Sequence, residues 1–210
     1  MRPSSLHRSA KRQSSAASPA CSKPTAGWPV AIVEHGFQGN RLTMLRIADA
    51  FADACFVVAA IDAPMHGITD KTSPFYCPTN PLCAAAGERT FNVDFINNAT
   101  NAQTPDGQTD GSGTWFFYVG NTLFSRDNLR QAEADMIVFT KSIGTLDFTG
   151  DGVADVDPKR VHYVGLSLSG IMGGSHLHFA GDTQTATLSV PGGPLSLVSL
   201  QSASLPFRGL

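Results

Sequence analysis

The feature that most constrains the fold is a serine flanked by small residues, GLSLSG at 165–170. A β-branched and aromatic segment at 161–164 precedes it and predicts a short strand. Small and apolar residues follow at 171–177 and predict a buried helix. A serine on a sharp strand-to-helix turn has a strained backbone, so its neighbours must be small. The sequence therefore predicts such a turn at Ser167, and the flanking strand and helix carry more of this prediction than the short motif does.

A second segment fits the same turn. Residues 28–33 (WPVAIV) are apolar without alternation, as in a buried parallel strand, and EHGFQGN follows at 34–40. A serine at such a turn is a nucleophile, and its attack on a carbonyl group places negative charge on the carbonyl oxygen. Preorganised backbone N–H groups stabilise that charge, by about 2.7–4 kcal/mol for one donor. We expect the amides of Phe37 and Leu168 to form this oxyanion hole. A glycine-rich turn that leads into a helix is the alternative interpretation.

The other periodic segments alternate between helices and strands. Apolar spacing predicts helices over 41–54 and 126–143 and strands over 56–61 and 185–190. This alternation predicts an α/β fold in which helices flank a mostly parallel sheet joined by right-handed crossovers. With 210 residues, 42% of them hydrophobic, the chain is long enough to form one such domain over residues 28–210.

Two segments do not fit the alternating pattern. Residues 1–27 are basic and rich in Ser, Ala and Pro, without the apolar run of a secretory signal, and predict a disordered leader; a transit peptide is the alternative. Residues from about 69 to 125 form an insertion rich in Asn, Thr, Pro and Gly, long enough to be functional. Its aromatic run WFFYV at 115–119 fits either a buried strand or the lining of an apolar substrate pocket.

Charge argues against nucleic acid as a partner. The net charge is −2, and every acidic residue lies at or after Glu34, so the globular part is acidic. No segment has the length and hydropathy of a transmembrane helix. A small-molecule or lipid ester is the partner that the chemistry of a nucleophilic serine favours.

Four cysteines bear on the redox environment. Cys77 and Cys83 bracket a turn-rich loop that could bring them within reach of a disulfide, which would indicate an oxidising compartment. Two free thiols are the alternative, and the spacing does not fit a zinc knuckle. Cys55, between a predicted helix and a predicted strand, is expected to be a buried thiol.

An acidic loop precedes the strand that leads to Ser167. Oxygen-bearing side chains stand at loop positions one, three, five and nine of a calcium-binding pattern, at Asp147, Thr149, Asp151 and Asp155. Position twelve is Pro158, where a bidentate glutamate is required. A calcium ion is therefore one interpretation, and a plain Asp/Gly turn is the favoured one; we expect that no cofactor is required.

Further motifs are distributed over residues 28–195. They are VEHG at 33–36, DAPMHG at 62–67, ERTFNVDF at 88–95, NNAT at 97–100, PDG at 105–107, SRDNLRQ at 125–131 and the serine turn. Together they resemble the bacterial virulence-factor lipase and esterase group of the α/β-hydrolases. The resemblance implies hydrolysis of lipid or short acyl esters through an acyl-enzyme on Ser167, in a secreted or cell-surface protein. The group's usual turn reads SLGG, and residue 169 departs from it because it is serine.

The resemblance also implies an acid and a histidine after the serine in chain order. The residues after Val190 contain neither. His35 and His66 follow predicted strands and are candidates for the base, although a structural role is favoured for both. We therefore expect an α/β-hydrolase core that is incomplete at its C-terminal end, with weak esterase activity.

Two other functions remain open. An acyltransferase or thioesterase can use the same serine and oxyanion hole. A non-catalytic lipid- or protein-binding module needs neither. An incomplete sheet would leave one edge unpaired, so self-association through that edge is a further expectation.

Overall fold

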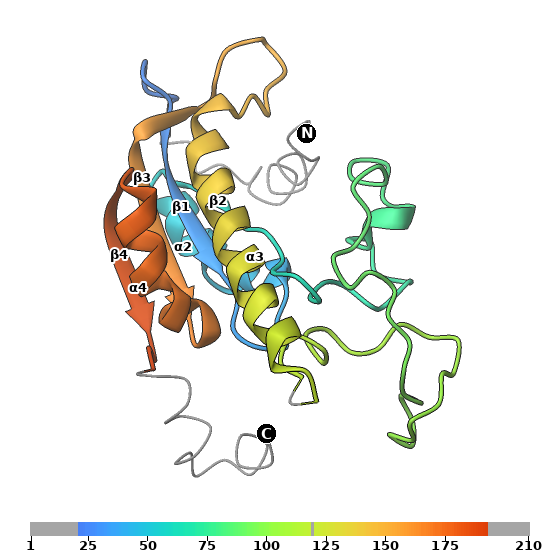
Figure 1. Ribbon diagram of the computed structural model, residues 1–210. Helices are drawn as coiled ribbons and strands as arrows, with labels where there is room; N and C mark the ends of the chain where they lie inside the picture. The colour runs from blue at the N-terminus through green and yellow to red at the C-terminus, as the bar shows by residue number, and fades with distance from the viewer. Residues whose placement is uncertain (1–20, 119, 193–210) are drawn as a thin grey trace.

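The core of the protein is a four-stranded parallel sheet, seen in a computed structural model that describes residues 21–118 and 120–192 (Figure 1). The strand order is β2-β1-β3-β4, and each neighbouring pair is parallel. The strands are β1 (Trp28–Glu34), β2 (Val57–Ala59), β3 (Val156–Leu166) and β4 (Thr183–Ser189). The prediction of an α/β fold with a parallel sheet is confirmed.

Helices cover both faces of this sheet (Figure 1). The helices are α2 (Leu45–Asp53), α3 (Thr122–Ser142) and α4 (Leu168–Ala180), and the 3-10 turns are η1 (Arg41–Met44), η2 (Cys77–Thr79) and η3 (Ile143–Thr145). Helix α2 lies on one face, and α3 and α4 lie together on the other. This arrangement buries β1 between two helical layers.

The side chains of β1 explain why it is central. Successive residues of a strand point to opposite faces, so both faces must be apolar when both are covered. Val30 and Ile32 pack with Met136 of α3 in one core cluster. Ala31 and Val33 belong to a second cluster, which α2 covers. The apolar run without alternation in this strand is therefore the direct consequence of burial on both faces.

The observed elements are shifted from the predicted ones mainly at their ends. β3 extends further toward the N-terminus than 161–164, and α4 begins at Leu168 rather than at 171. α3 begins at Thr122 because the Asn121 side chain accepts a hydrogen bond from the backbone N–H of Phe124 and caps the helix. β2 is shorter than the strand predicted over 56–61.

The insertion between β2 and α3 has η2 as its only regular element among the described residues, and it projects as a lobe to one side of the sheet (Figure 1). Its aromatic run is not a strand: the described residues 115–118 form turns. Phe116 is fully buried against Leu168 and Ala132, whereas Tyr118 is exposed. The run therefore divides between core packing and the surface.

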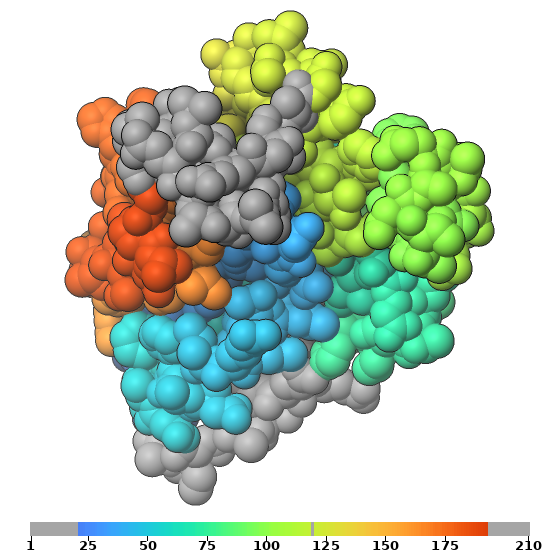
Figure 2. All heavy atoms as spheres, turned by 90° about the horizontal axis from the view of Figure 1, so that it is seen from below, coloured from blue at the N-terminus to red at the C-terminus, as the bar shows by residue number. Residues whose placement is uncertain are grey.

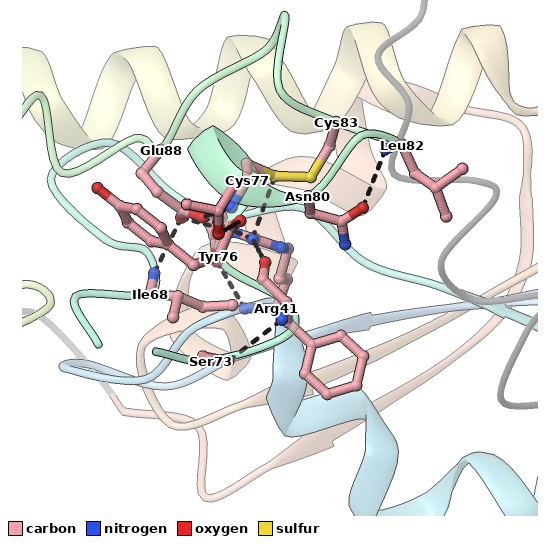
Figure 3. The surroundings of a disulfide bond; sticks show 12 residues. Arg41, Ile68, Ser73, Tyr76, Cys77, Asn80, Leu82, Cys83 and Glu88 are labelled. Carbon is pink, nitrogen blue, oxygen red and sulfur yellow. Dashed lines mark hydrogen bonds and ion pairs between the residues drawn. A yellow bond between two sulfur atoms is a disulfide. The ribbon is translucent and has the colours of Figure 1, made fainter. Parts of the chain in front are cut away.

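A buried ion cluster fastens this insertion to the sheet (Figure 3). Arg41, at the start of η1, forms an ion pair with Asp62 after β2 and donates two hydrogen bonds of 2.8 Å to the two carboxylate oxygens of Glu88. Glu88 also accepts hydrogen bonds from the backbone N–H groups of Ile68 and Cys77. The three charged side chains are at most 7% exposed, so they form one desolvated unit.

Two disulfides are present. Cys77 and Cys83 are joined, as the loop between them predicted (Figure 3). Cys55 is bonded to Cys21, so the expectation of a buried thiol at Cys55 was wrong. The partner is 34 positions away in a segment assigned to the leader, and only the fold brings the two sulfurs together.

Residues 21–27 are consequently not part of a disordered leader. Besides the disulfide at Cys21, Lys23 forms an ion pair of 2.6 Å with Asp155, and the backbone of Trp28 donates to the Asp155 carbonyl oxygen. The rest of the predicted leader, residues 1–20, lies outside the described residues. Within the described part of the chain, no helix has the length and apolar character needed to cross a membrane.

Candidate functional site

The predicted strand-turn-helix is present at Ser167, which stands between β3 and α4. Its backbone has φ 56° and ψ −110°, a conformation that L-amino acids rarely adopt. Two hydrogen bonds hold this backbone: Ser167 N–H donates to Ser189 at the end of β4, and its carbonyl accepts from Ile171 in α4. The side chain is exposed at the carboxyl edge of the sheet. Strain of this kind is characteristic of functional positions.

Glycines make room for this turn. A Cβ atom at Gly165 would lie 2.4 Å from the carbonyl oxygen of Ser169, and one at Gly170 would lie 2.7 Å from that of Ser189. Both contacts are with backbone, which cannot move aside. A Cβ at Gly36 would lie 3.1 Å from the Ser167 Cβ, so the loop after β1 passes directly beside the serine.

Ser169, the departure from the glycine of similar turns, is accommodated by hydrogen bonds. Its hydroxyl is buried, accepts from Leu166 N–H at 2.8 Å and donates to the Glu34 carbonyl oxygen at 2.8 Å. The hydroxyl thus connects the end of β3 to the end of β1. Sequence reasoning treated this residue only as a small substitute for glycine, and nothing in the short motif indicates the partner in β1.

The two residues expected to form the oxyanion hole lie on the two sides of the turn. Leu168 is the first residue of α4, where backbone N–H groups have no partner within the helix and the helix dipole is positive. Phe37 follows Gly36, and its side chain packs with Leu168 in a cluster that includes Phe116. The loop that carries Phe37 therefore passes beside Ser167 at Gly36, and the Phe37 side chain contacts the cluster that contains Leu168, although positions 37 and 168 are far apart in sequence.

His35 and His66, the candidates for a base, have a structural role. His35 donates from Nδ1 to the Gly36 carbonyl oxygen and accepts at Nε2 from Ala63 N–H. His66 donates from Nδ1 to the Pro64 carbonyl oxygen and accepts at Nε2 from Gln38 N–H. With both ring nitrogens bonded to backbone, neither imidazole is available to take a proton from Ser167. They hold the loops after β1 and β2 against each other, with ring centroids 4.7 Å apart.

Burial keeps these histidines neutral. Desolvation lowers the pKa of His35, and it lowers the pKa of His66 to about 3. His176 of α4, buried against Thr140, also has a pKa lowered by burial, to about 4. Among the described residues, no side chain forms a hydrogen bond with the Ser167 hydroxyl.

Acid is expected to destabilise the protein through His66. Its pKa is about 6.5 in an unfolded chain and about 3 in the folded one, so the stabilisation is complete above pH 6.5 and is lost as the pH falls toward 3. At pH 5, about 1.5 units below the unfolded-state pKa, the free energy of unfolding is lower by about 2 kcal/mol, because each pH unit corresponds to about 1.36 kcal/mol. Burial raises the pKa of Glu34, which acts in the opposite direction. The measurement is therefore the difference between wild type and His66→Asn in the free energy of unfolding at pH 5 and pH 7.5.

The pH dependence should be smaller in His66→Asn, because asparagine does not gain a proton on unfolding. His178→Asn, at an exposed position of α4, should retain the wild-type dependence. Equal pH dependence in all three proteins would contradict the assignment.

The acidic loop at 147–155 is an Asp/Gly turn, the interpretation favoured from the sequence, and its carboxylates accept hydrogen bonds within the protein. Asp147 accepts from the N–H groups of Gly150 and Gly152. Asp155 is fully buried and accepts from Lys23 and from Thr149 N–H. Within the described residues, no group of three or more His, Cys, Asp or Glu side chains is placed to hold a metal ion. Of the four positions considered for calcium, Asp147, Thr149, Asp151 and Asp155, the two buried or turn-capping carboxylates, Asp147 and Asp155, have backbone amides and Lys23 as their partners.

Comparisons with known proteins add little. No protein-family model matches the chain, and the curated proteins contain no match. Among solved structures, the chain is similar to one described as the crystal structure of BES protein from Bacillus cereus, at 16% identity and a TM-score of 0.32. The alignment covers 83% of this chain and 53% of that one, so the chain spans about half of its length. A similarity of this size does not assign a fold or a function.

Proposed function

We propose that the protein is a serine carboxylic-ester hydrolase with an α/β-hydrolase type of core, and that Ser167 is its nucleophile. The observation that carries this proposal is the strained backbone of Ser167, at φ 56°, on an exposed turn between β3 and α4. A turn of this kind holds a serine hydroxyl away from the backbone and beside the N-terminus of the following helix. The substrate class, a lipid or short acyl ester, comes from the sequence resemblance.

In the proposed reaction the Ser167 oxygen attacks the ester carbonyl carbon. The backbone N–H groups of Phe37 and Leu168 donate hydrogen bonds to the carbonyl oxygen as it becomes negatively charged. The C–O bond to the alcohol then breaks, and the alcohol leaves with the proton that the Ser167 hydroxyl has lost. Water hydrolyses the resulting acyl-enzyme, releases the carboxylic acid and restores the Ser167 hydroxyl.

The proposal includes slow turnover for the chain as described. A serine hydroxyl is a poor nucleophile without a base, and both imidazoles nearest the strand ends are bonded to backbone. An oxyanion hole and substrate binding without a full triad still accelerate hydrolysis by about 10³–10⁴ over water. For a short-chain ester we therefore expect hydrolysis that is faster than the reaction in water by about this factor.

A fluorophosphonate probe tests whether Ser167 is activated. The probe forms a phosphorus–oxygen bond with a nucleophilic serine and releases fluoride. Because a serine without a base reacts slowly, we expect slow labelling that reaches one label per chain on prolonged incubation, located at Ser167 by peptide mass spectrometry and lost in Ser167→Ala. Ser175→Ala is the matched control, because Ser175 is an exposed serine of α4 that should not react.

Two results would reject the proposal. An unlabelled wild type would favour the alternative of a non-catalytic binding module. Labelling that persists in Ser167→Ala would place the reactive group elsewhere.

Hydrolysis of a p-nitrophenyl butyrate ester, beside a thioester and an anilide of the same acid, then separates esterase from thioesterase and amidase activity. Ester hydrolysis at ordinary enzyme rates that Ser167→Ala abolishes would mean that another residue supplies the base.

A further inference from the structure

A pocket of about 330 Å³ opens on the insertion, and none of the residues that line it is assigned to the reaction. Four aromatic side chains line it: Phe95, Trp115, Tyr118 and Phe124. Met65 completes the apolar lining, and Gln103 and Asn121 contribute two amides. The lobe that carries Phe95 lies beside the segment that leads into α3 (Figure 2). We call this site the aromatic pocket.

A buried carboxylate fixes two of its walls. Asp110 is 3% exposed, and its Oδ2 accepts a hydrogen bond of 2.6 Å from the Trp115 indole N–H. The same oxygen accepts one of 2.8 Å from the backbone N–H of Phe95. Trp115 is thereby held with its ring 5.3 Å from that of Phe95, at 78°. One buried carboxylate oxygen therefore fixes the positions of Trp115 and Phe95 relative to each other.

The third aromatic wall is fixed separately. The hydroxyl of Ser125, in the first turn of α3, accepts a hydrogen bond from the backbone N–H of Tyr118 and donates one to the Tyr118 carbonyl oxygen. The Tyr118 ring lies against Gly120, where a Cβ would come within 2.6 Å of it, and 5.5 Å from the Trp115 ring. Phe95 and Tyr118 nevertheless remain 58% and 46% exposed. Aromatic rings that are held in place and left open to solvent are typical of a binding surface.

The lining defines the chemistry of the ligand. No cationic side chain lines the aromatic pocket, so burying an anionic ligand there would be unfavourable. The Asn121 Oδ1 is used in capping α3, which leaves its Nδ2 group as a donor. The Gln103 amide has no hydrogen bond to a described residue, which leaves a second donor. A ligand with a flat ring and an acceptor oxygen matches these groups.

We propose that the aromatic pocket binds neutral molecules that carry an aromatic ring and a carbonyl or ether oxygen. The ring packs against Phe95, Trp115 and Tyr118, and the oxygen accepts a hydrogen bond from Gln103 or Asn121. The site also contacts the serine turn indirectly, because Met65 packs in the same cluster as Leu168. Binding does not depend on the reactivity of Ser167.

Binding of 2-acetylnaphthalene, a ketone that an esterase cannot hydrolyse, tests this site in the full chain. We expect saturable binding by ligand-observed NMR. The ring-saturated analogue 2-acetyldecalin and the anion 2-naphthoate should each bind at least about tenfold more weakly, because the first loses ring–ring contacts and the second carries a charge. This expectation does not depend on whether the fluorophosphonate probe labels Ser167. The proposal of ligand binding in the aromatic pocket and the proposal of esterase activity can therefore be rejected independently.

Replacing the walls of the aromatic pocket gives the structural control. Phe95→Ala and Tyr118→Ala should each raise the Kd of 2-acetylnaphthalene by about tenfold, the equivalent of about 1.4 kcal/mol. Phe179→Ala removes an equally exposed phenylalanine from α4 and should leave the Kd unchanged. Thermal unfolding by circular dichroism checks that each variant is folded. An unchanged Kd in both pocket variants, equal binding of 2-acetyldecalin, or no saturable binding would overturn the proposal.

Discussion

Replacing Arg41 with methionine is expected to lower the free energy of unfolding by about 3–5 kcal/mol, the usual cost of removing one partner from a buried ion pair. The replacement leaves the carboxylates of Asp62 and Glu88, at 3% and 1% exposure, without their cation. It also removes the hydrogen bond from Arg41 to the Phe75 carbonyl oxygen. Urea denaturation under oxidising conditions measures the loss while both disulfides are retained.

Two further variants separate charge from geometry. Arg41→Lys keeps the charge but loses the two parallel hydrogen bonds to Glu88, so an intermediate loss is expected. Lys141→Met removes a cation from an exposed pair with Asp182, where about 0–1 kcal/mol is expected. The assignment of Arg41 as the anchor of the insertion fails if Arg41→Met costs no more than Lys141→Met.

Gly165→Ala is expected to destabilise the protein by about 1–3 kcal/mol, the usual range for an overpacked site. The new Cβ would lie 2.4 Å from the Ser169 carbonyl oxygen and 2.8 Å from Cε1 of Tyr163. Relief requires α4 to move away from β3, which displaces Ser167. We therefore expect weaker fluorophosphonate labelling together with a lower unfolding temperature.

Gly174→Ala is the matched control for this substitution. Gly174 is also in α4, but a Cβ there would meet nothing within 4 Å. Alanine at an exposed helical position should stabilise by about 0.5–1 kcal/mol. The two changes are thus expected to have opposite signs. A stable, fully labelled Gly165→Ala protein would show that the turn is looser than the structure indicates.

The features that were predicted correctly are those that depend on local pattern. The continuous apolar run at 28–33 identified a buried parallel strand, and the small residues around Ser167 identified the turn, because each pattern reflects the immediate surroundings of its own backbone. The Cys77–Cys83 disulfide could be predicted for the same reason, since a short turn joins the two residues.

The features that were missed depend on residues distant in sequence. The bond of Cys55 to Cys21, the hydroxyl of Ser169 bonded to the Glu34 carbonyl and the Arg41 pairs with Asp62 and Glu88 each join separate elements. Local periodicity contains no information on such pairs. The local signal for the ion cluster was Arg41, a charged residue that directly follows the loop at 34–40 and begins the predicted helix.

The order of the strands has a consequence for how the chain assembles. Val30 of β1 pairs with Val57 of β2 on one side and with Val161 of β3 on the other. During synthesis the first pairing becomes possible early, but the second must wait until the insertion and α3 have been made. Distant pairings of this kind slow folding, and until β3 arrives the open side of β1 is exposed to other nascent chains. The whole insertion therefore has to be synthesised before β3 can complete the sheet.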